Sequence, residues 1–328
     1  MKKSALVLAV IAIVALAAGR IYEVRGEKRD RELLPQIGRS IDIGGRSLNI
    51  FCAGEGVPPL IFESAGGPGY FWTHIQPEIA KLTTACWYDR AGEGWSDPGP
   101  YPRTSVAIAT DLHTLLQRAQ IPGPYVLVGW SFGGLNVRAY NGLYPQDVAG
   151  MVLVDSAHED EPVRAPKFFL ARTAPRYLRY PAYLLLKFFE WFGIVRIAQP
   201  RPPQRVSSRQ QMVRALRLQP KSIVNDISTG LQVPESYRQA HELGRKTNVP
   251  LIVLTAGKPQ PWGDPQMARQ AAAYQQVWVH EIQPQLVQLS SRGQQIIVEN
   301  SDHGIPDNAP DVVISAVQEI VRIIKATR

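Results

Sequence analysis

One stretch of this chain, residues 125–138, constrains its fold more than any other. It begins as a short apolar run, typical of a buried strand, and ends with the pattern of a helix start. Between the two lie Gly129, Ser131 and Gly133 in a Gly-x-Ser-x-Gly arrangement. A serine on so sharp a strand-to-helix turn needs small neighbours, because the turn crowds the backbone. The stretch therefore predicts a sheet with a serine hydroxyl exposed at the carboxyl end of one strand.

A five-residue match of this kind is common by chance, so the flanking elements decide its meaning. A hairpin pattern covers residues 41–52, and strand-like and helix-like runs then alternate along the chain. The predicted strands cover residues 59–64, 85–89, 148–155, 250–255 and 295–299, and the predicted helices cover 70–83, 104–120, 265–290 and 311–325. Alternation of this type implies crossover connections and a mostly parallel sheet.

The N-terminal segment has the pattern of a membrane-directed sequence. Two lysines precede an apolar run over residues 5–18, which is typical of a secretory signal or signal-anchor. The run is shorter than the roughly 20 residues of a comfortable membrane span, and Ala15-Leu16-Ala17 offers a cleavage pattern. We expect residues 1–19 to be a signal peptide or membrane anchor and residues 20–36 a polar tether. The folded domain is then exported or membrane-anchored, outside the cytoplasm.

The charge and composition limit the classes of partner that the chain could bind. The 328 residues carry a net charge of +8, and much of the excess is local: residues 164–217 hold twelve Lys and Arg and one acid, Glu190. No nucleic-acid-binding motif accompanies this charge, so we expect no nucleic-acid partner. The histidines are scattered without ligand spacing, so neither a metal nor an organic cofactor is indicated. Only two cysteines are present, which excludes a disulfide-rich framework.

A serine hydroxyl is a weak nucleophile unless a base, itself held by a third group, takes its proton. In an open α/β sheet, ligands bind outside the carboxyl ends of the strands, so the partners of Ser131 should follow strands. His303 does so, four residues past the last predicted strand. The other candidates lie in predicted helices and are interpreted as structural: His74, His113, His241 and His280. We therefore expect Ser131 as nucleophile and His303 as base.

At this point the chain resembles the α/β-hydrolases from about residue 37 to its C-terminus. Residues 129–134 resemble their nucleophile turn, residues 88–96 resemble their strand-4 turn, and residues 65–69 resemble their His-Gly-Gly-Pro-Gly loop with Ala65 in place of the His. The resemblance implies an eight-stranded, mostly parallel sheet built from residues 37–157 and 250–328, with a helical lid over 158–249 after strand six. It also implies an oxyanion hole formed by the N–H groups of Phe132 and Gly67.

The third member of the site has two main candidates. The family usually places the acid after the next-to-last strand, where this chain reaches only Asp264, late and beside a proline. Some members take it from the end of the strand after the nucleophile helix, which here is Asp155. We expect Asp155, with Asp264 as the alternative and Asp302 as a third.

The predicted activity is that of a serine hydrolase that cleaves carboxylic esters or related acyl bonds through an acyl-Ser131 intermediate. An iminopeptidase or amidase is the alternative within enzymes, since such relatives share the glycine loop. A non-catalytic binding protein on the same scaffold is a third reading, although an intact Ser131 and His303 count against it. The substrate is expected to be a small, hydrophobic acyl compound, because the lid is rich in apolar and aromatic residues.

The lid itself admits two interpretations. Its segment at residues 168–197 combines apolar and aromatic side chains with Lys and Arg, which suits a helix at an anionic lipid surface. The same pattern suits an apolar lid that packs over the pocket, with its basic residues in water.

The resemblance also places the two cysteines. In the family's sheet the second strand is antiparallel to the fourth, which brings Cys52 near Cys86. A disulfide between them is expected if the domain is exported, and two buried thiols are the alternative.

Overall fold

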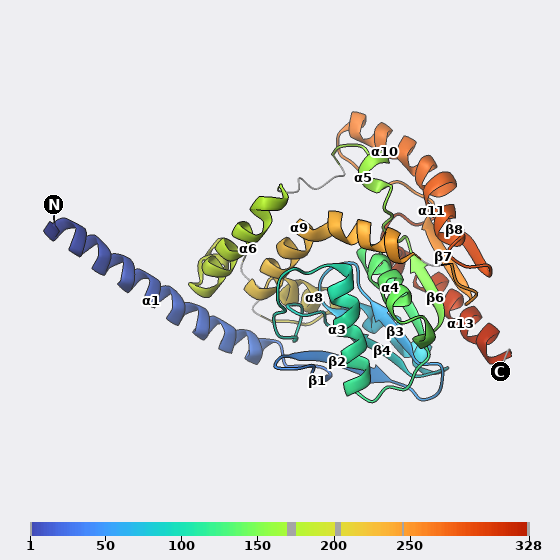
Figure 1. Ribbon diagram of the computed structural model, residues 1–328, viewed down its shortest axis with the longest axis horizontal. Helices are drawn as coiled ribbons and strands as arrows, with labels where there is room; N and C mark the ends of the chain where they lie inside the picture. Colours follow the sequence, from blue (N-terminus) through green and yellow to red (C-terminus); the bar gives the residue numbers. More distant parts are fainter. Residues whose placement is uncertain (1, 169–174, 201–204, 245, 327–328) are drawn as a thin grey trace.

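An eight-stranded sheet forms the centre of the molecule (Figure 1). The structure is a computed structural model that describes residues 2–168, 175–200, 205–244 and 246–326. The strand order is β1-β2-β4-β3-β5-β6-β7-β8. The pairs β1–β2 and β2–β4 are antiparallel, and every other pair is parallel. The predicted fold class, a mostly parallel eight-stranded sheet with an inserted helical segment after β6, is confirmed.

The strands lie close to the predicted runs. Their bounds are β1 (Arg39–Asp42), β2 (Ser47–Ala53), β3 (Leu60–Glu63), β4 (Ala85–Tyr88), β5 (Tyr125–Trp130), β6 (Val148–Val154), β7 (Leu251–Ala256) and β8 (Gly293–Val298). The strands β3 and β7 are buried along their whole length. Their mostly apolar sequences fit this burial, because a parallel sheet is covered on both faces.

Helices cover both faces of the sheet and make two apolar cores. One core lies under α3 (Ser105–Arg118) and α4 (Phe132–Leu143). The other lies under the 3₁₀ helix η1 (Gly69–His74), α2 (Gln76–Ala80) and α13 (Pro310–Ala326). Both cores include side chains of β3, β5, β6 and β7, so the parallel centre of the sheet is covered on both faces.

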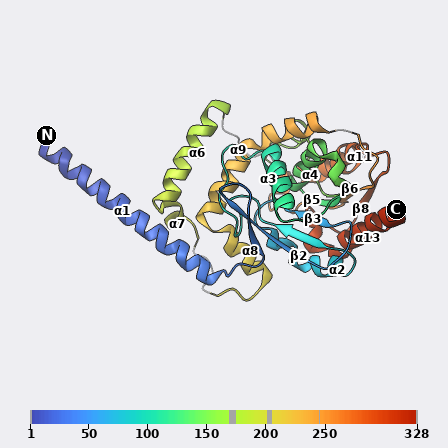
Figure 2. The ribbon, with the colours of Figure 1, turned by 60° about the horizontal axis from the view of Figure 1, so that its bottom comes forward.

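The insertion between β6 and β7 is helical. Its helices are α5 (Glu161–Arg164), α6 (Arg176–Trp191), α7 (Ile194–Ala198), α8 (Arg209–Arg217) and α9 (Pro220–Leu243). Residues 169–174, 201–204 and 245 of the predicted lid lie outside the described residues. Figures 1 and 2 show α9 lying against the main domain while α6 stands away from it. After β7, the chain forms α10 (Pro265–Val277), a π-helical turn η3 (Trp278–Ile282) and α11 (Gln283–Val287), and α12 (Ile305–Asn308) precedes α13.

The N-terminal helix α1 (Lys2–Leu33) projects from the domain in both ribbon views (Figures 1 and 2). Within the described residues, it is the one helix long and apolar enough to cross a membrane. The stretch whose composition predicts a polar tether continues this helix to Leu33, shortly before Pro35. Residues 20–33 contain no proline and are rich in Arg, Glu and Lys, which favour helix.

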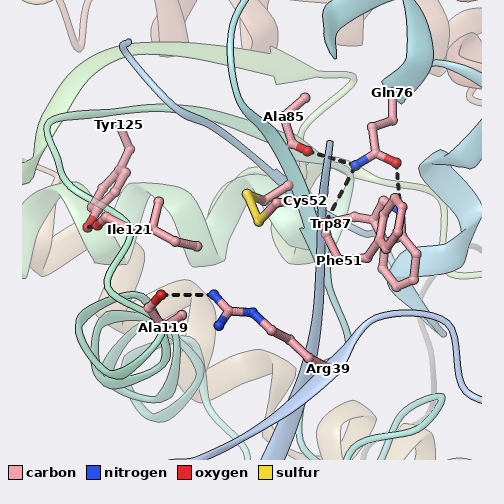
Figure 3. The surroundings of a disulfide bond; sticks show 10 residues. Arg39, Phe51, Cys52, Gln76, Ala85, Trp87, Ala119, Ile121 and Tyr125 are labelled. Carbon is pink, nitrogen blue, oxygen red and sulfur yellow. Dashed lines mark hydrogen bonds between the residues drawn. A yellow bond between two sulfur atoms is a disulfide. The ribbon is translucent and has the colours of Figure 1, made fainter. Parts of the chain in front are cut away.

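Cys52 and Cys86 form a disulfide (Figure 3). They lie directly opposite each other on the antiparallel strands β2 and β4, with their Cα atoms 4.1 Å apart. Close by, the Gln76 side-chain amide donates to the Ala85 carbonyl and accepts from the Trp87 indole N–H. The bridge therefore links the adjacent strands β2 and β4, next to the edge strand β1 and beside the α2 side chain of Gln76.

Candidate active site

Ser131 lies at the carboxyl end of β5, on the turn into α4. Its φ of +53° is in the left-handed region, which costs a non-glycine residue on the order of 1–3 kcal/mol. The turn is crowded: a Cβ on Gly133 would lie 2.6 Å from the Glu63 carbonyl oxygen, and a Cβ on Gly129 would lie 2.7 Å from the Gly133 carbonyl oxygen. Glycine at both positions therefore permits the strained turn that projects the serine from the sheet.

His303 lies between Ser131 and Asp155. Its Nε2 atom is 2.9 Å from Ser131 Oγ, and its Nδ1 atom is 2.6 Å from Asp155 Oδ2. With the proton on Nδ1, the ring donates to Asp155 and leaves Nε2 to accept from the serine hydroxyl. The three side chains come from the ends of β5, β6 and β8, so the sheet edge brings together residues up to 172 positions apart.

Asp155 is fixed by several donors. While Oδ2 faces His303, Oδ1 accepts from the Ala256 N–H at 3.0 Å and from the Trp278 indole N–H at 2.8 Å. Asp155 itself has a φ of +40° and is buried. A carboxylate with two neutral donors on one oxygen keeps the other oxygen aimed at the imidazole.

The alternative acids lie elsewhere. Asp264 is exposed and caps α10, where its side chain accepts from the N–H groups of Gln266 and Met267. Asp302 accepts from the Gly304 N–H and the Asn308 side chain. Neither carboxylate is hydrogen-bonded to His303 within the described residues, so the geometry favours Asp155 over both.

The surroundings of His303 change its proton affinity. Removal of the ring from water lowers its pKa, whereas the hydrogen bond to Asp155 and the charge of that carboxylate raise it. The net result is a pKa above the ordinary value of 6.5. An imidazole of this kind is well suited to accept a proton from a hydroxyl at neutral pH.

The two predicted oxyanion-hole residues lie on different elements, Phe132 at the start of α4 and Gly67 on the loop after β3. Phe132 is the first residue of α4, so its N–H has no intrahelical acceptor. Gly67 has a φ of +78° on the loop after β3, and the Arg217 side chain covers its Cα. Asp89 anchors this loop, because its side chain accepts a hydrogen bond from the Gly69 N–H at 2.7 Å.

Two cavities meet at His303. The smaller, about 130 Å³, is lined by Ser131, Asp155, Glu161, Lys258, Tyr274 and His303. The larger, about 700 Å³, has a mostly apolar wall formed by Ala65, Gly66, Phe71, Trp130, Val213 and Leu218. Three arginines of the lid also line the larger cavity: Arg209, Arg214 and Arg217. The arrangement leaves room for a substrate on both sides of His303.

Sequence reasoning did not find three residues that support this site. Trp130 donates from its indole to the His303 carbonyl oxygen, Trp278 donates to Asp155, and Glu161 lines the smaller cavity. Trp130 occupies the variable position directly before Ser131 in the Gly-x-Ser-x-Gly motif, and this position could have identified it from the sequence. Trp278 carries no such signal, because it reaches the site from the π-helical turn η3, far along the chain from β6. Glu161 follows β6 closely, but no motif marks it.

The chain matches the family model described as "Alpha/beta hydrolase family" over residues 50–316. Among curated proteins it is 34% identical over 159 residues to the protein named "Probable transporter efuK" of Hormonema carpetanum, which covers 44% of this chain and 22% of that protein. The chain spans less than half the length of the curated relatives that it matches first.

Among solved structures, the chain is similar to a thermophilic esterase from Thermogutta terrifontis, with a TM-score of 0.60 and 18% identity over 88% of this chain and 99% of that one. It is also similar to the epoxide hydrolase CorEH, with a TM-score of 0.61 and 16% identity over 88% of this chain and 99% of that one. At these identities the likeness is one of fold.

Proposed function

Because the chain belongs to the alpha/beta hydrolase family, we propose that it is a serine hydrolase that cleaves carboxylic ester bonds. The observation that carries this proposal is the unbroken contact from Ser131 Oγ through the His303 ring to Asp155. In this proposal Ser131 is the nucleophile, His303 the general base and Asp155 the group that orients and stabilises the imidazolium.

The reaction proceeds in two halves. The Ser131 oxygen attacks the ester carbonyl while its proton passes to His303 Nε2, and the N–H groups of Phe132 and Gly67 stabilise the oxyanion. The leaving alcohol takes the proton from His303, which leaves an acyl-Ser131 intermediate. Water, deprotonated by the same imidazole, then attacks the acyl group. The bond between the acyl carbon and Ser131 Oγ breaks, Oγ takes the proton back from His303, and the acid is released.

The type of nucleophile separates ester cleavage from the chemistry of the epoxide hydrolase neighbour. An aspartate nucleophile is expected of soluble epoxide hydrolases, whereas this chain presents a serine at the turn. The apolar wall of the larger cavity supports a hydrophobic acyl or alkoxy group, with Phe71 and Trp130 stacked at 4.7 Å between ring centres.

One observation favours aminoacyl substrates as a second candidate. Glu161 lines the same small cavity as Ser131, and its carboxylate accepts from the Tyr237 hydroxyl at 2.8 Å. Burial raises the pKa of this carboxyl, and the positive charge of a bound ammonium group would lower it again. A carboxylate here is suited to hold the ammonium group of an aminoacyl amide, as in an iminopeptidase.

Two experiments test the proposal. Labelling of the native protein by a fluorophosphonate is expected in the wild type and absent in Ser131→Ala, and equal labelling of both would contradict a nucleophilic Ser131. Turnover is then measured on esters of increasing acyl length and on aminoacyl amides. Higher kcat/KM for esters supports the first candidate, and amide cleavage lost in Glu161→Gln supports the second.

For the N-terminal helix we propose a membrane anchor with the domain outside the cytoplasm. The proposal rests on the apolar run of α1, on the two lysines before that run and on the Cys52–Cys86 disulfide, which is typical of an oxidising compartment. Protease added to intact cells should digest the domain, because the domain lies outside the cytoplasm in this proposal. A domain that survives the protease would face inward and contradict the proposal.

A further inference from the structure

The polar half of α1 docks on the lid through one helical face. Gly19, Glu23, Gly26 and Asp30 lie at positions i, i+4, i+7 and i+11, and the last three are buried while most of their neighbours are exposed. Both carboxylates contact Arg196 of α7: Glu23 at 2.9 Å and Asp30 at 2.8 Å. We refer to Glu23, Asp30 and Arg196 as the clamp.

The two glycines allow the helices to approach closely. A Cβ on Gly19 would lie 2.3 Å from the Phe192 carbonyl oxygen, and a Cβ on Gly26 would lie 2.3 Å from the Arg196 side chain. At the same level, the Arg20 guanidinium lies 3.9 Å from the centre of the Trp191 ring. The C-terminal end of α6 is therefore fixed against α1 where the apolar run of that helix ends.

The clamp makes this docking specific. The side chains of Arg196, Glu23 and Asp30 are only 4%, 3% and 12% exposed. Loss of one partner from a buried ion pair costs about 3–5 kcal/mol, because the remaining charge stays buried without compensation. The orientation of α6 and α7 relative to α1 is thus set by charge as well as by shape.

The exposed face of α6 is apolar. Five residues at helical spacing form a stripe that is 43–77% exposed, and they are Tyr177, Tyr180, Leu184, Phe188 and Trp191. Leu178 and Leu185 are exposed beside it. The helix carries three basic residues and one acid. A stripe of this kind is unfavourable in water and typical of a helix that lies in an anionic membrane surface.

The orientation of α6 relative to α1 is the one expected if α6 lies on a membrane surface. In both ribbon views α6 runs crosswise to α1 (Figures 1 and 2). When α1 crosses a bilayer along its normal, a crosswise helix docked at the end of the apolar run lies along the membrane plane. The Arg20–Trp191 contact then falls at the headgroup level, where aromatic and basic side chains are enriched.

We infer that α6 is an interfacial helix that rests on the anionic phospholipid bilayer spanned by α1, and that the clamp holds it there. The lid is thereby a membrane-binding element whose position is set by the anchor helix. This inference concerns binding, so it does not depend on the chemistry at Ser131.

The test uses the full-length, oxidised protein in lipid nanodiscs that contain anionic phospholipid. A fluorescent probe is attached at Leu184→Cys on the stripe, and at Val163→Cys, an 87% exposed position on α5, as a control. Nitroxide-bearing lipids are expected to quench the probe at position 184 by about half or more and the probe at 163 hardly at all. The quenching at 184 should fall in nanodiscs of neutral lipid.

Several outcomes would overturn the inference. A probe at 184 that stays in water in every lipid mixture shows that the stripe does not meet the bilayer. A probe shielded from water and from lipid quenchers shows that a protein, such as a second copy of the chain, covers the stripe. Quenching that is equal in neutral and anionic lipid refutes the role of charge.

A second arm tests the clamp. In Glu23→Gln, Asp30→Asn the quenching at position 184 should fall at least about twofold, because Arg196 loses both partners. The matched control is Glu32→Gln, which removes an exposed carboxylate from the same helix without touching the clamp or the Arg20–Trp191 contact. Equal quenching in the clamp variant and this control would refute the clamp's role, and carbonate extraction of the expressing membranes verifies that α1 remains inserted in both.

Discussion

The indole N–H of Trp130 donates to the backbone oxygen of His303 at 3.0 Å, so the residue beside the serine also holds the loop that carries the base. Trp130→Phe keeps an aromatic ring against Phe71 and removes only the donor. The orphaned carbonyl costs about 1–3 kcal/mol, and we expect kcat to fall roughly tenfold with little change in KM. The measurement is steady-state kinetics on the best ester.

Trp95→Phe is the control for that variant. Its indole makes a similar bond, at 2.8 Å to the Leu34 carbonyl oxygen, outside both cavities that meet at His303. A comparable loss of stability with unchanged kcat is expected. An equal fall of kcat in both variants would show that Trp130 acts through global stability alone.

Asp155→Asn should abolish most of the activity, whereas Asp264→Asn should have little effect. An asparagine at 155 would favour the wrong imidazole tautomer, and a change of this kind in a serine–histidine–aspartate site lowers kcat by roughly 10⁴-fold. Asp264 caps α10, so its loss costs only about 0.5–2 kcal/mol of stability. Burst and steady-state kinetics distinguish the two, and equal mild losses would remove Asp155 from the site.

The pH dependence of kcat/KM reports the state of His303. The neutral ring is the active base, so activity rises with pH as the ring loses its proton. Because the pKa of His303 lies above 6.5, the acid limb should lie above pH 6.5. A limb well below pH 6.5 in the wild type would contradict the influence of Asp155. In Asp155→Asn, the residual activity should show the limb at lower pH.

The helices α4 and α9 offer a matched pair of glycines. A Cβ on Gly134 would lie 1.9 Å from Ser156 Oγ, whereas a Cβ on Gly230 would meet nothing within 4 Å. Gly134→Ala should destabilise the protein by about 1–3 kcal/mol. Gly230→Ala should stabilise it by up to about 1 kcal/mol, because alanine favours helix. Urea denaturation measures both, and the same sign for the two would refute the packing described for α4.

The disulfide should matter for stability and little for activity. Cys52 and Cys86 are 34 residues apart, and a bridge over a loop of that size contributes about 2–4 kcal/mol. The double variant Cys52→Ala, Cys86→Ala should therefore unfold at lower urea with kcat/KM nearly unchanged. A wild type whose unfolding midpoint does not respond to reductant would show that the bridge is not formed.

Much of the fold could be predicted from the sequence because its signals are local. The serine turn, the alternation of strands and helices, and the place of His303 after the last strand all lie within short windows. The acidic residue of the site was harder to predict, because Asp155 and Asp264 both follow strands. Only the hydrogen bonds that Trp278 and Ala256 donate to the Asp155 carboxylate distinguish them.

The docking of residues 20–33 on the lid could not be predicted from the sequence, for a different physical reason. Arg and Glu interspersed with Gly have the composition of a solvated segment, and nothing local shows that Glu23 and Asp30 meet an arginine 173 and 166 positions further on. The spacing 19, 23, 26 and 30 was readable as one helical face. Its partner became visible only in the folded chain.

The position of that face bears on how the protein could be released from a membrane. A cut after Ala17 would remove the apolar run and leave Gly19, Glu23, Gly26 and Asp30 on the shortened chain. Release from the membrane and docking of α6 and α7 on the remaining helix would then be independent of each other. The peptide that is removed contains none of the docking residues. A tethered enzyme and a diffusible one would share the same architecture around Arg196, and would differ only in where they meet their substrate.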